Sequence, residues 1–195
     1  MPLAFRQLSG PALAAALEDV AALRIAVFRD WPYLYDGDPA YERQYLAPYL
    51  KSDAATVIGA FDADRLVGAA TALPLSAHSD DFSAAFAGTG YDLSRLWYCA
   101  ESVLLPAYRG QGAGHRFFDL REARARDLGF AHSCFCAVVR PDTHPARPAG
   151  YRSLDGFWQA RGYSPLAGVT ARFAWKDIGE ASETEKPLQF WIRAL

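Results

Sequence analysis

Residues Trp97–Leu128 limit the possible folds more than any other segment, because they predict an apolar strand followed by a glycine-rich turn and a long helix. The apolar run is interrupted only by Glu101 and Ser102, which suits a strand at the centre of a sheet. It ends at Pro106, because proline cannot donate a hydrogen bond to a strand ladder. Glycines let the backbone approach a ligand closely, and the N-terminus of the helix predicted over 113–128 presents unpaired N–H groups. The turn is therefore predicted to bind an anion, in particular a phosphate.

Three kinds of phosphate-binding loop can be compared with this turn. A Walker A loop ends in Gly-Lys-Ser/Thr, and neither a lysine nor a hydroxyl residue follows the glycines here. A dinucleotide-binding G-x-G-x-x-G motif would begin at Gly110 and Gly112, but His115 stands in place of its third glycine. The pattern Arg/Gln-x-x-Gly-x-Gly/Ala is complete, with Arg109, Gly112 and Gly114. The remaining alternative is a turn that starts the helix without binding a ligand.

Together with the strand before it, from Glu101 to His115, this pattern resembles the acetyl-CoA pyrophosphate loop of the GNAT superfamily of N-acetyltransferases. The resemblance implies that acetyl-CoA is the cosubstrate and that backbone N–H groups of the turn hold its pyrophosphate. It also implies that the end of the strand contacts the pantetheine arm. The cofactor-binding residues implied in this way are Val103, Leu104, Leu105, Arg109, Gly110, Gln111, Gly112, Ala113, Gly114 and His115.

The composition limits the class of protein. The chain has 195 residues, enough for one domain with a sizeable core, which we expect to span 1–195, and its 51% of hydrophobic residues is typical of a globular protein. A net charge of −2 argues against a nucleic-acid partner, and no apolar run is long enough to cross a membrane. The odd set Cys99, Cys134 and Cys136 suits reduced core thiols of a cytoplasmic protein. No second ligand pair stands at a suitable spacing, so no metal is expected.

The order of the predicted elements indicates the fold class. Strands are expected at 3–8, 54–61, 65–73, 97–105, 132–139, 163–175 and 188–193, and helices at 10–28, 40–50, 80–87, 113–128 and 153–161. This order predicts an α/β (or α+β) protein whose sheet is covered by helices on both faces. It also matches the GNAT fold, which implies a mixed, mostly antiparallel sheet of about seven strands. An exposed seventh strand would support a homodimer.

The resemblance implies an N-acetyltransferase in which a primary amine attacks the acetyl thioester directly. A lysine-like amine with a pKa near 10.4 is mostly protonated at pH 7, and its deprotonation costs roughly 4.6 kcal/mol. Glu101 is the only acid on the predicted central strand and precedes the segment expected to contact the cofactor. It is therefore our candidate for the general base. The alternative is a glutamate that pairs with a nearby arginine.

The departing thiolate needs a proton donor, and here the sequence departs from the family that it resembles. Trp158 holds the position of the family's usual tyrosine, four residues before Gly162, and its indole has no useful proton to give a thiolate. Tyr151 is our candidate for the general acid, with Tyr98 and a water molecule as alternatives. The same departure leaves open a second function, a non-catalytic acyl-CoA-binding or regulatory module with the same fold.

Aromatic and acidic residues between the first two predicted helices are the candidates for binding the substrate. They are Trp31, Tyr33, Tyr35 and Asp36. Carboxylates attract a cation and aromatic faces hold one, which suits a small-molecule or peptide amine. A solvated loop with anchoring aromatic residues is the alternative. Four further residues, on the proline-containing loop 140–152, are candidates for binding the CoA 3′-phosphate or a substrate carboxylate unless that loop is an ordinary surface loop: Arg140, His144, Arg147 and Arg152.

Overall fold

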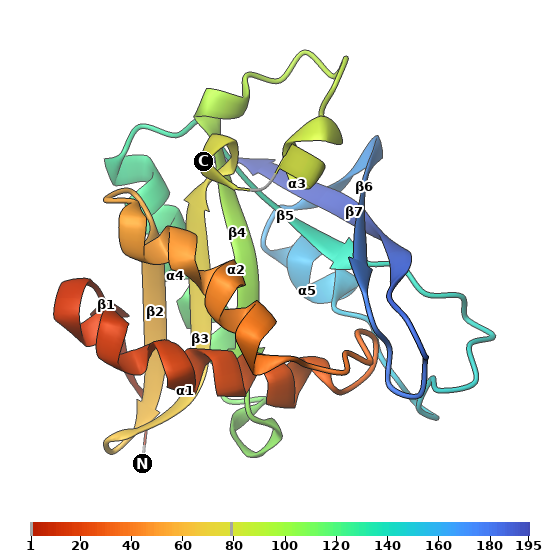
Figure 1. Ribbon diagram of the computed structural model, residues 1–195. Coiled ribbons are helices and arrows are strands. Elements are labelled where there is room, and N and C mark those ends of the chain that lie inside the picture. The colour runs from red at the N-terminus through yellow and green to blue at the C-terminus, as the bar shows by residue number, and fades with distance from the viewer. Residues whose placement is uncertain (1, 79) are drawn as a thin grey trace.

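One mixed sheet crosses the part of the chain that the computed structural model describes, residues 2–78 and 80–195 (Figure 1). Its strands are β1 (Ala4–Leu8), β2 (Thr56–Asp62), β3 (Arg65–Pro74), β4 (Leu96–Leu104), β5 (His132–Val138), β6 (Ser164–Trp175) and β7 (Thr184–Ala194). They lie in the order β1-β2-β3-β4-β5-β7-β6. Only β4 and β5 run parallel, and every other pair of neighbours is antiparallel. The predicted mixed, mostly antiparallel sheet is confirmed.

Helices cover both faces of this sheet, as predicted. Within the described residues they are α1 (Gly10–Phe28), α2 (Pro39–Lys51), α3 (Asp80–Ala84), α4 (Ala113–Asp127) and α5 (Asp155–Ala160). Figure 1 shows α1 and α2 on one face and α4 and α5 on the other. The side chain of Asp38 caps α2 by accepting a hydrogen bond from the N–H of Ala40 at 2.7 Å. None of these described helices is long and apolar enough to cross a bilayer.

Two expectations about the last strand are wrong. β7 begins at Thr184 rather than at residue 188, because Thr184 already lies opposite Trp175 at the end of β6 and the antiparallel pairing continues from there. β7 also lies between β5 and β6, so the edges of the sheet are β1 and β6. The sheet edge that we expected β7 to offer to a second copy of the chain is therefore already paired.

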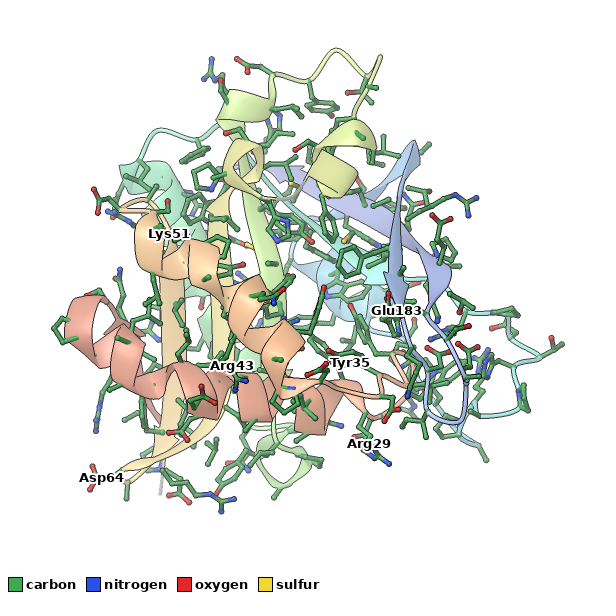
Figure 2. The ribbon with its side chains drawn as sticks, viewed as in Figure 1. Arg29, Tyr35, Arg43, Lys51, Asp64 and Glu183 are labelled. Atoms are coloured by element: carbon green, nitrogen blue, oxygen red, sulfur yellow. The ribbon has the colours of Figure 1, made fainter. Side chains whose placement is uncertain are left out.

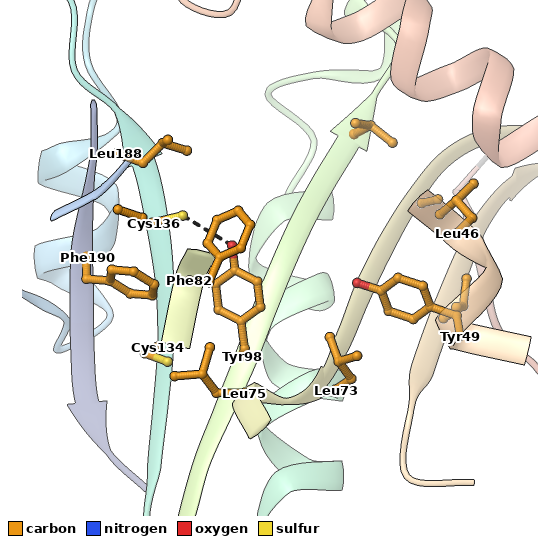
Figure 3. Close-up of a cluster of buried hydrophobic side chains, with 14 of the residues drawn as sticks. Leu46, Tyr49, Leu73, Leu75, Phe82, Tyr98, Cys134, Cys136, Leu188 and Phe190 are labelled. Atoms are coloured by element: carbon orange, nitrogen blue, oxygen red, sulfur yellow. Dashed lines mark hydrogen bonds between the residues drawn. The ribbon is translucent and has the colours of Figure 1, made fainter. Parts of the chain in front are cut away.

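The larger core lies between the sheet and the helices α1 and α2. Figure 3 shows part of it, where Phe82, Tyr98 and Phe190 gather beside β4, β5 and β7. The hydroxyl of Tyr98 lies 3.1 Å from the sulfur of Cys136. All three cysteines are buried free thiols, and burial raises the pKa of Cys136 to about 12. These thiols are protonated at neutral pH and act as small core side chains.

β4 and β5 pair only over their first residues. The parallel pairing ends where Tyr98 lies opposite Cys134, and beyond that point the two strands diverge (Figure 1). β5 remains in the sheet because it pairs along its length with β7. The sheet therefore opens at the carboxyl ends of its two parallel strands, where ligands commonly bind in sheets of this kind.

Candidate functional site

A large cavity lies where β4 and β5 separate. Its volume is about 1020 Å³, and its walls come from both strands, from the glycine-rich turn before α4, and from α5 with the loop before it. It also reaches the loop after α1, at Trp31, Pro32 and Tyr33. The separation of two parallel strands thus brings the predicted phosphate turn, Glu101 and part of the predicted substrate loop around one space.

The glycine-rich turn has the geometry of an anion-binding site. Gly110 and Gly112 have φ angles of 76° and 82°, a region that favours glycine, and Gly112 is the N-cap of α4. The first hydrogen bond of α4 runs from the N–H of Arg116 to the carbonyl of Gly112, so the N–H groups of the first turn lack helical partners. A Cβ added at either glycine would meet no atom within 4 Å. With no acid in the first turn of α4, this open cradle of N–H groups fits a pyrophosphate.

Two side chains support the shape of this turn. The Nε–H of Arg109 donates to the carbonyl of Leu104 at 3.2 Å, which ties the turn to the end of β4. Gly114 allows α4 to approach α5, because a Cβ at this position would lie 3.3 Å from Cζ of Phe157. Both observations give these motif residues a structural role beside any contact with a ligand.

The end of β4 is arranged differently from part of our expectation. Leu104 lines the large cavity, whereas Val103 is buried in the core on the side of α1 and α2. The N–H of Leu105 donates to the carbonyl of Val67 at 3.0 Å. This N–H is therefore engaged by β3, and Leu105 has no free N–H for the pantetheine arm or the thioester oxygen.

Glu101 owes its position to a β-bulge in β4. Thr71 of β3 lies opposite Glu101 and Leu73 lies opposite Tyr98, so the one residue between them on β3 faces two on β4. The extra residue turns Glu101 to the face of the sheet occupied by Tyr98, α1 and α2. Arg121, buried on α4, donates to the carbonyls of Glu101 on β4 and Thr71 on β3 at 2.9 and 3.2 Å, and so satisfies one carbonyl of each strand beside the bulge.

The carboxylate of Glu101 is buried in an ionic cluster. Its Oε2 accepts hydrogen bonds from Nη1 of Arg24 at 2.8 Å and from the hydroxyl of Tyr45 at 3.2 Å. Arg24 also pairs through Nε with Glu42, which is fully buried. Burial alone would lower the pKa of Arg24, but the carboxylates of Glu101 and Glu42 outweigh it and raise that pKa. Oε1 of Glu101 has no hydrogen-bond partner among the described residues. Glu101 is therefore both paired with an arginine and presented to the cavity that it lines.

The candidate proton donors lie at different depths. Tyr151 lines the large cavity next to Trp31, with 5.9 Å between ring centroids, and burial raises the pKa of its hydroxyl, which keeps it protonated. Trp158 also lines the cavity and packs against Phe135 and Trp191. The hydroxyl of Tyr98 faces the sulfur of Cys136 (Figure 3).

The residues predicted to bind the substrate do not form one patch. Trp31 and Tyr33 line the large cavity, and Tyr35 lines a smaller pocket beside α1 and α2. Asp36 lines neither, because it pairs with Lys176 at 2.7 Å and lies 4.0 Å from Arg29, which is exposed at the end of α1 (Figure 2). Lys176 accordingly lowers the pKa of Asp36, first through a hydrogen bond and then through its charge. Asp36 fastens the loop to the end of β6 instead of facing the cavity.

The loop 140–152 also differs from the expectation of a ligand-binding arginine cluster. Arg140 donates to the carbonyls of Pro32 and Tyr33 and makes two hydrogen bonds to the carboxylate of Asp177. These contacts leave it little capacity for a phosphate, so Arg140 joins the loop after α1 to the turn between β6 and β7. Arg147 pairs with Asp142.

A smaller inner pocket of about 70 Å³ continues from the large cavity toward α1 and α2. The two spaces share wall residues, among them Phe28, Tyr33 and Glu101. The other walls of the inner pocket are mostly aromatic and include Tyr45, Phe82, Tyr98 and Trp175. Glu101 thus lies at the junction between the space beside the phosphate turn and an aromatic recess.

Sequence reasoning missed three residues that shape this site: Arg24, Tyr45 and Arg121. Each is a polar residue on a helix face that packs against the sheet. For Arg24 a signal existed, because it follows Val20 by four residues and so falls on the apolar stripe of α1. A charged residue on a buried stripe indicates a buried partner of opposite charge, but the partner itself cannot be read from the spacing.

Comparison with known proteins agrees with this geometry. No curated protein matches the chain. Among solved structures, a ribosomal-protein-alanine N-acetyltransferase from Brucella melitensis is similar, with a TM-score of 0.63, 15% identity and coverage of 99% of this chain and 100% of that one. A phosphinothricin acetyltransferase from Sinorhizobium meliloti, in complex with AcCoA, has a TM-score of 0.61 and 16% identity, covering 100% of this chain and 89% of that one.

At these identities the structural neighbours show the fold alone, whereas the family follows from the sequence. The profile of the acetyltransferase (GNAT) family matches residues 17–152, which include most of α1, the opened strands and the glycine-rich turn. The resemblance inferred from the turn is thereby confirmed. The chain belongs to the acetyltransferase (GNAT) family and is an acetyl-CoA-dependent N-acetyltransferase.

Proposed function

We propose that this enzyme transfers the acetyl group directly to a primary amine, with Glu101 as the acceptor of the amine proton. Acetyl-CoA supplies an acetyl thioester: the amine nitrogen forms a bond to the acetyl carbon, the carbon–sulfur bond breaks, and the sulfur leaves as a thiolate. An alkylammonium loses two protons overall, one before attack and one from the new amide nitrogen, and the thiolate takes up one. The residues of the chain must therefore accept protons near the nitrogen and donate one near the sulfur.

The position of Glu101 is the observation that carries this proposal. Its carboxylate is buried at the junction of the two cavities, and the same strand ends at the phosphate turn. Oε1 has no partner among the described residues, so one oxygen remains to accept a proton. Arg24 holds Oε2 and with it the orientation of the carboxylate. Positioned general bases of this kind contribute about 10²–10⁴-fold to a rate.

Tyr151 is our proposal for the proton donor to the thiolate. It lines the large cavity and, with its pKa raised by burial, carries a proton at neutral pH. Trp158, in the position of the usual family tyrosine, packs between aromatic rings and serves as a wall of the cavity. Tyr98 is less suited, because its hydroxyl is directed to Cys136.

For the cosubstrate we propose that the N–H groups at Gly112, Ala113, Gly114 and His115 hold the pyrophosphate and that the end of β4 receives the pantetheine arm. The free N–H groups at the start of α4 and the open space at Gly110 and Gly112 support this assignment. We further propose a small-molecule or peptide amine as the partner, and a cytoplasmic location without a nucleic-acid or membrane partner. A homodimer stays a prediction, without support from an exposed β7.

The experiment that tests the site compares CoA affinity between two glycine variants. Gly112→Glu introduces bulk and negative charge where we place the pyrophosphate, and we expect it to weaken CoA binding at least about 100-fold in calorimetry. Gly129→Glu is the matched control, because Gly129 has a similar φ of 79°, open surroundings and a place at the opposite end of α4. Unchanged affinity in Gly112→Glu, or equal loss in both variants, would refute the assignment of the turn.

A further inference from the structure

We propose that the acceptor is a small alkylammonium monoamine without an acidic group, and that its ammonium group binds in the inner pocket beside Glu101. This inference rests on the proposed function and adds the chemical class of the substrate. It follows from the charge, the wall chemistry and the size of the inner pocket.

The charge of the pocket calls for one cation. Of the described residues that line it, Arg24 and Glu101 are the charged ones, and Glu42 contacts Arg24 from behind. One guanidinium therefore faces two buried carboxylates, which leaves a net charge of −1 in a place shielded from water. Burial lowers the pKa of nearby His78 to about 4, so His78 is neutral at pH 7 and does not supply the missing charge. A monocation bound beside Oε1 of Glu101 would neutralise this remaining negative charge.

The walls of the pocket suit a cation as well as an apolar stem. Tyr33, Phe82 and Tyr98 line the space, and aromatic faces attract cations within about 6 Å. The pocket already contains one such contact, because the guanidinium of Arg24 lies 4.0 Å from the ring centroid of Tyr45. An ammonium group would pair with the carboxylate of Glu101, and its alkyl stem would pack against the aromatic walls. A neutral apolar molecule would leave the carboxylate without a counterion.

The size of the pocket limits the stem. About 70 Å³ is roughly half of the 150 Å³ apolar cavity that binds benzene. The pocket thus accommodates an ammonium group with a stem of about two or three carbons. An aromatic ring attached to the amine would have to displace Phe82 or another wall residue.

A carboxylate next to the amine is excluded by the same charges. An α-amino acid would place its carboxylate within about 4 Å of Glu101, and the guanidinium of Arg24 is already engaged by two carboxylates. At an effective dielectric constant of about 20, this repulsion costs about 4 kcal/mol. At 1.4 kcal/mol per tenfold change, the affinity for the amino acid falls about 1000-fold. The acceptor site is therefore expected to select monoamines over amino acids.

The test uses matched amines and two readouts. Alanine is ethylamine with an added carboxylate. 2-Phenylethylamine carries a phenyl ring where propylamine carries its terminal methyl group. Calorimetry with the CoA-saturated enzyme measures binding without reaction, and kcat/KM with acetyl-CoA measures transfer. We expect ethylamine and propylamine to bind and react, alanine to be about 1000-fold poorer than ethylamine, and 2-phenylethylamine at least about tenfold poorer than propylamine.

Two variants test whether the inner pocket makes this selection. Phe82→Ala removes a wall of the pocket and should raise the ratio of kcat/KM for 2-phenylethylamine over propylamine at least about tenfold. Phe86→Ala is the control, because Phe86 is equally buried just after α3 but does not line the pocket. A general loss of stability would lower kcat/KM for both amines equally in both variants, so the ratio of the two values would not change.

Three results would overturn the inference. One is a kcat/KM for alanine that equals or exceeds the value for ethylamine. Another is a ratio of kcat/KM for 2-phenylethylamine over propylamine that is the same in Phe82→Ala as in the unmodified enzyme. The third is binding of CoA with no binding or reaction of any amine in the panel, a result that leaves the assignment of the cosubstrate site intact. Failure of CoA itself to bind would instead refute the proposed function, and the inference with it.

Discussion

Replacement of Arg24 by methionine tests the buried ionic cluster that holds Glu101. Arg24 is 6% exposed and pairs with two carboxylates from different elements, Glu42 on α2 and Glu101 on β4. Methionine has a similar length but no charge, so it also loses the contacts of the guanidinium with the rings of Phe28 and Tyr45. The change therefore removes the positive charge and leaves two buried carboxylates without their shared partner.

The expected loss is large for one substitution. Removing one partner of a buried ion pair typically costs about 3–5 kcal/mol, because the remaining charge stays buried and uncompensated. In a domain of this size, 1 kcal/mol shifts the melting temperature by about 2–4 °C, so we expect Tm to fall by roughly 6–20 °C. Urea unfolding followed by circular dichroism and tryptophan fluorescence gives the free energy, provided that the m-value is unchanged.

The companion variant separates the charge from the packing. Arg24→Met combined with Glu42→Gln and Glu101→Gln removes all three charges and keeps the volumes, and replacing a whole buried ionic group is often nearly neutral. We expect this triple variant to recover most of the stability lost in the single one. The reasoning would be refuted if the single variant lost less than about 1 kcal/mol, or if the triple variant were no more stable than the single one.

Further predictions concern three polar residues around the site. His78 has a pKa lowered by burial to about 4, below about 6.5 in the unfolded chain. As the pH falls, the unfolded state therefore takes up this proton before the folded state does. The free energy of unfolding should fall by about 3 kcal/mol as the pH drops from 6.5 to 4. Urea unfolding of His78→Asn should show a smaller fall in the free energy of unfolding over the same pH range. Tyr151→Phe should lower kcat about 100-fold with unchanged CoA affinity in calorimetry, and an unchanged kcat would exclude Tyr151 as the acid. Arg121→Met should destabilise the fold by about 3 kcal/mol in chemical unfolding, because two carbonyls beside the bulge, one on β3 and one on β4, lose their donor; a loss below about 0.5 kcal/mol would show that water replaces it.

Local signals made much of the fold predictable. Each expected helix boundary lies within three residues of the observed one; the first helix was expected over 10–28, as found, and the second over 40–50, where the structure has Pro39–Lys51. The phosphate turn was predictable because the positive φ angles at Gly110 and Gly112 depend on residue type and on neighbours along the chain. The extent and position of β7 were not, because a strand is defined by its partner, and residues 184–187 have little strand pattern of their own.

In the candidate site, too, some features were predictable from adjacent residues and others were not. The strand, the turn and the helix of the proposed phosphate site were predictable from residues adjacent in the chain, and Glu101 was recognisable as the one acid on that strand. The direction in which Glu101 faces was not predictable, since strict alternation would place it on the face of Trp97 and Cys99, and the bulge reverses this. The packing of the elements also brings Arg24, remote in sequence, to that carboxylate and pairs Asp36 with Lys176. The physical reason is that local backbone conformation follows from adjacent residues, whereas the partner of a buried charge is set by how the helices pack on the sheet.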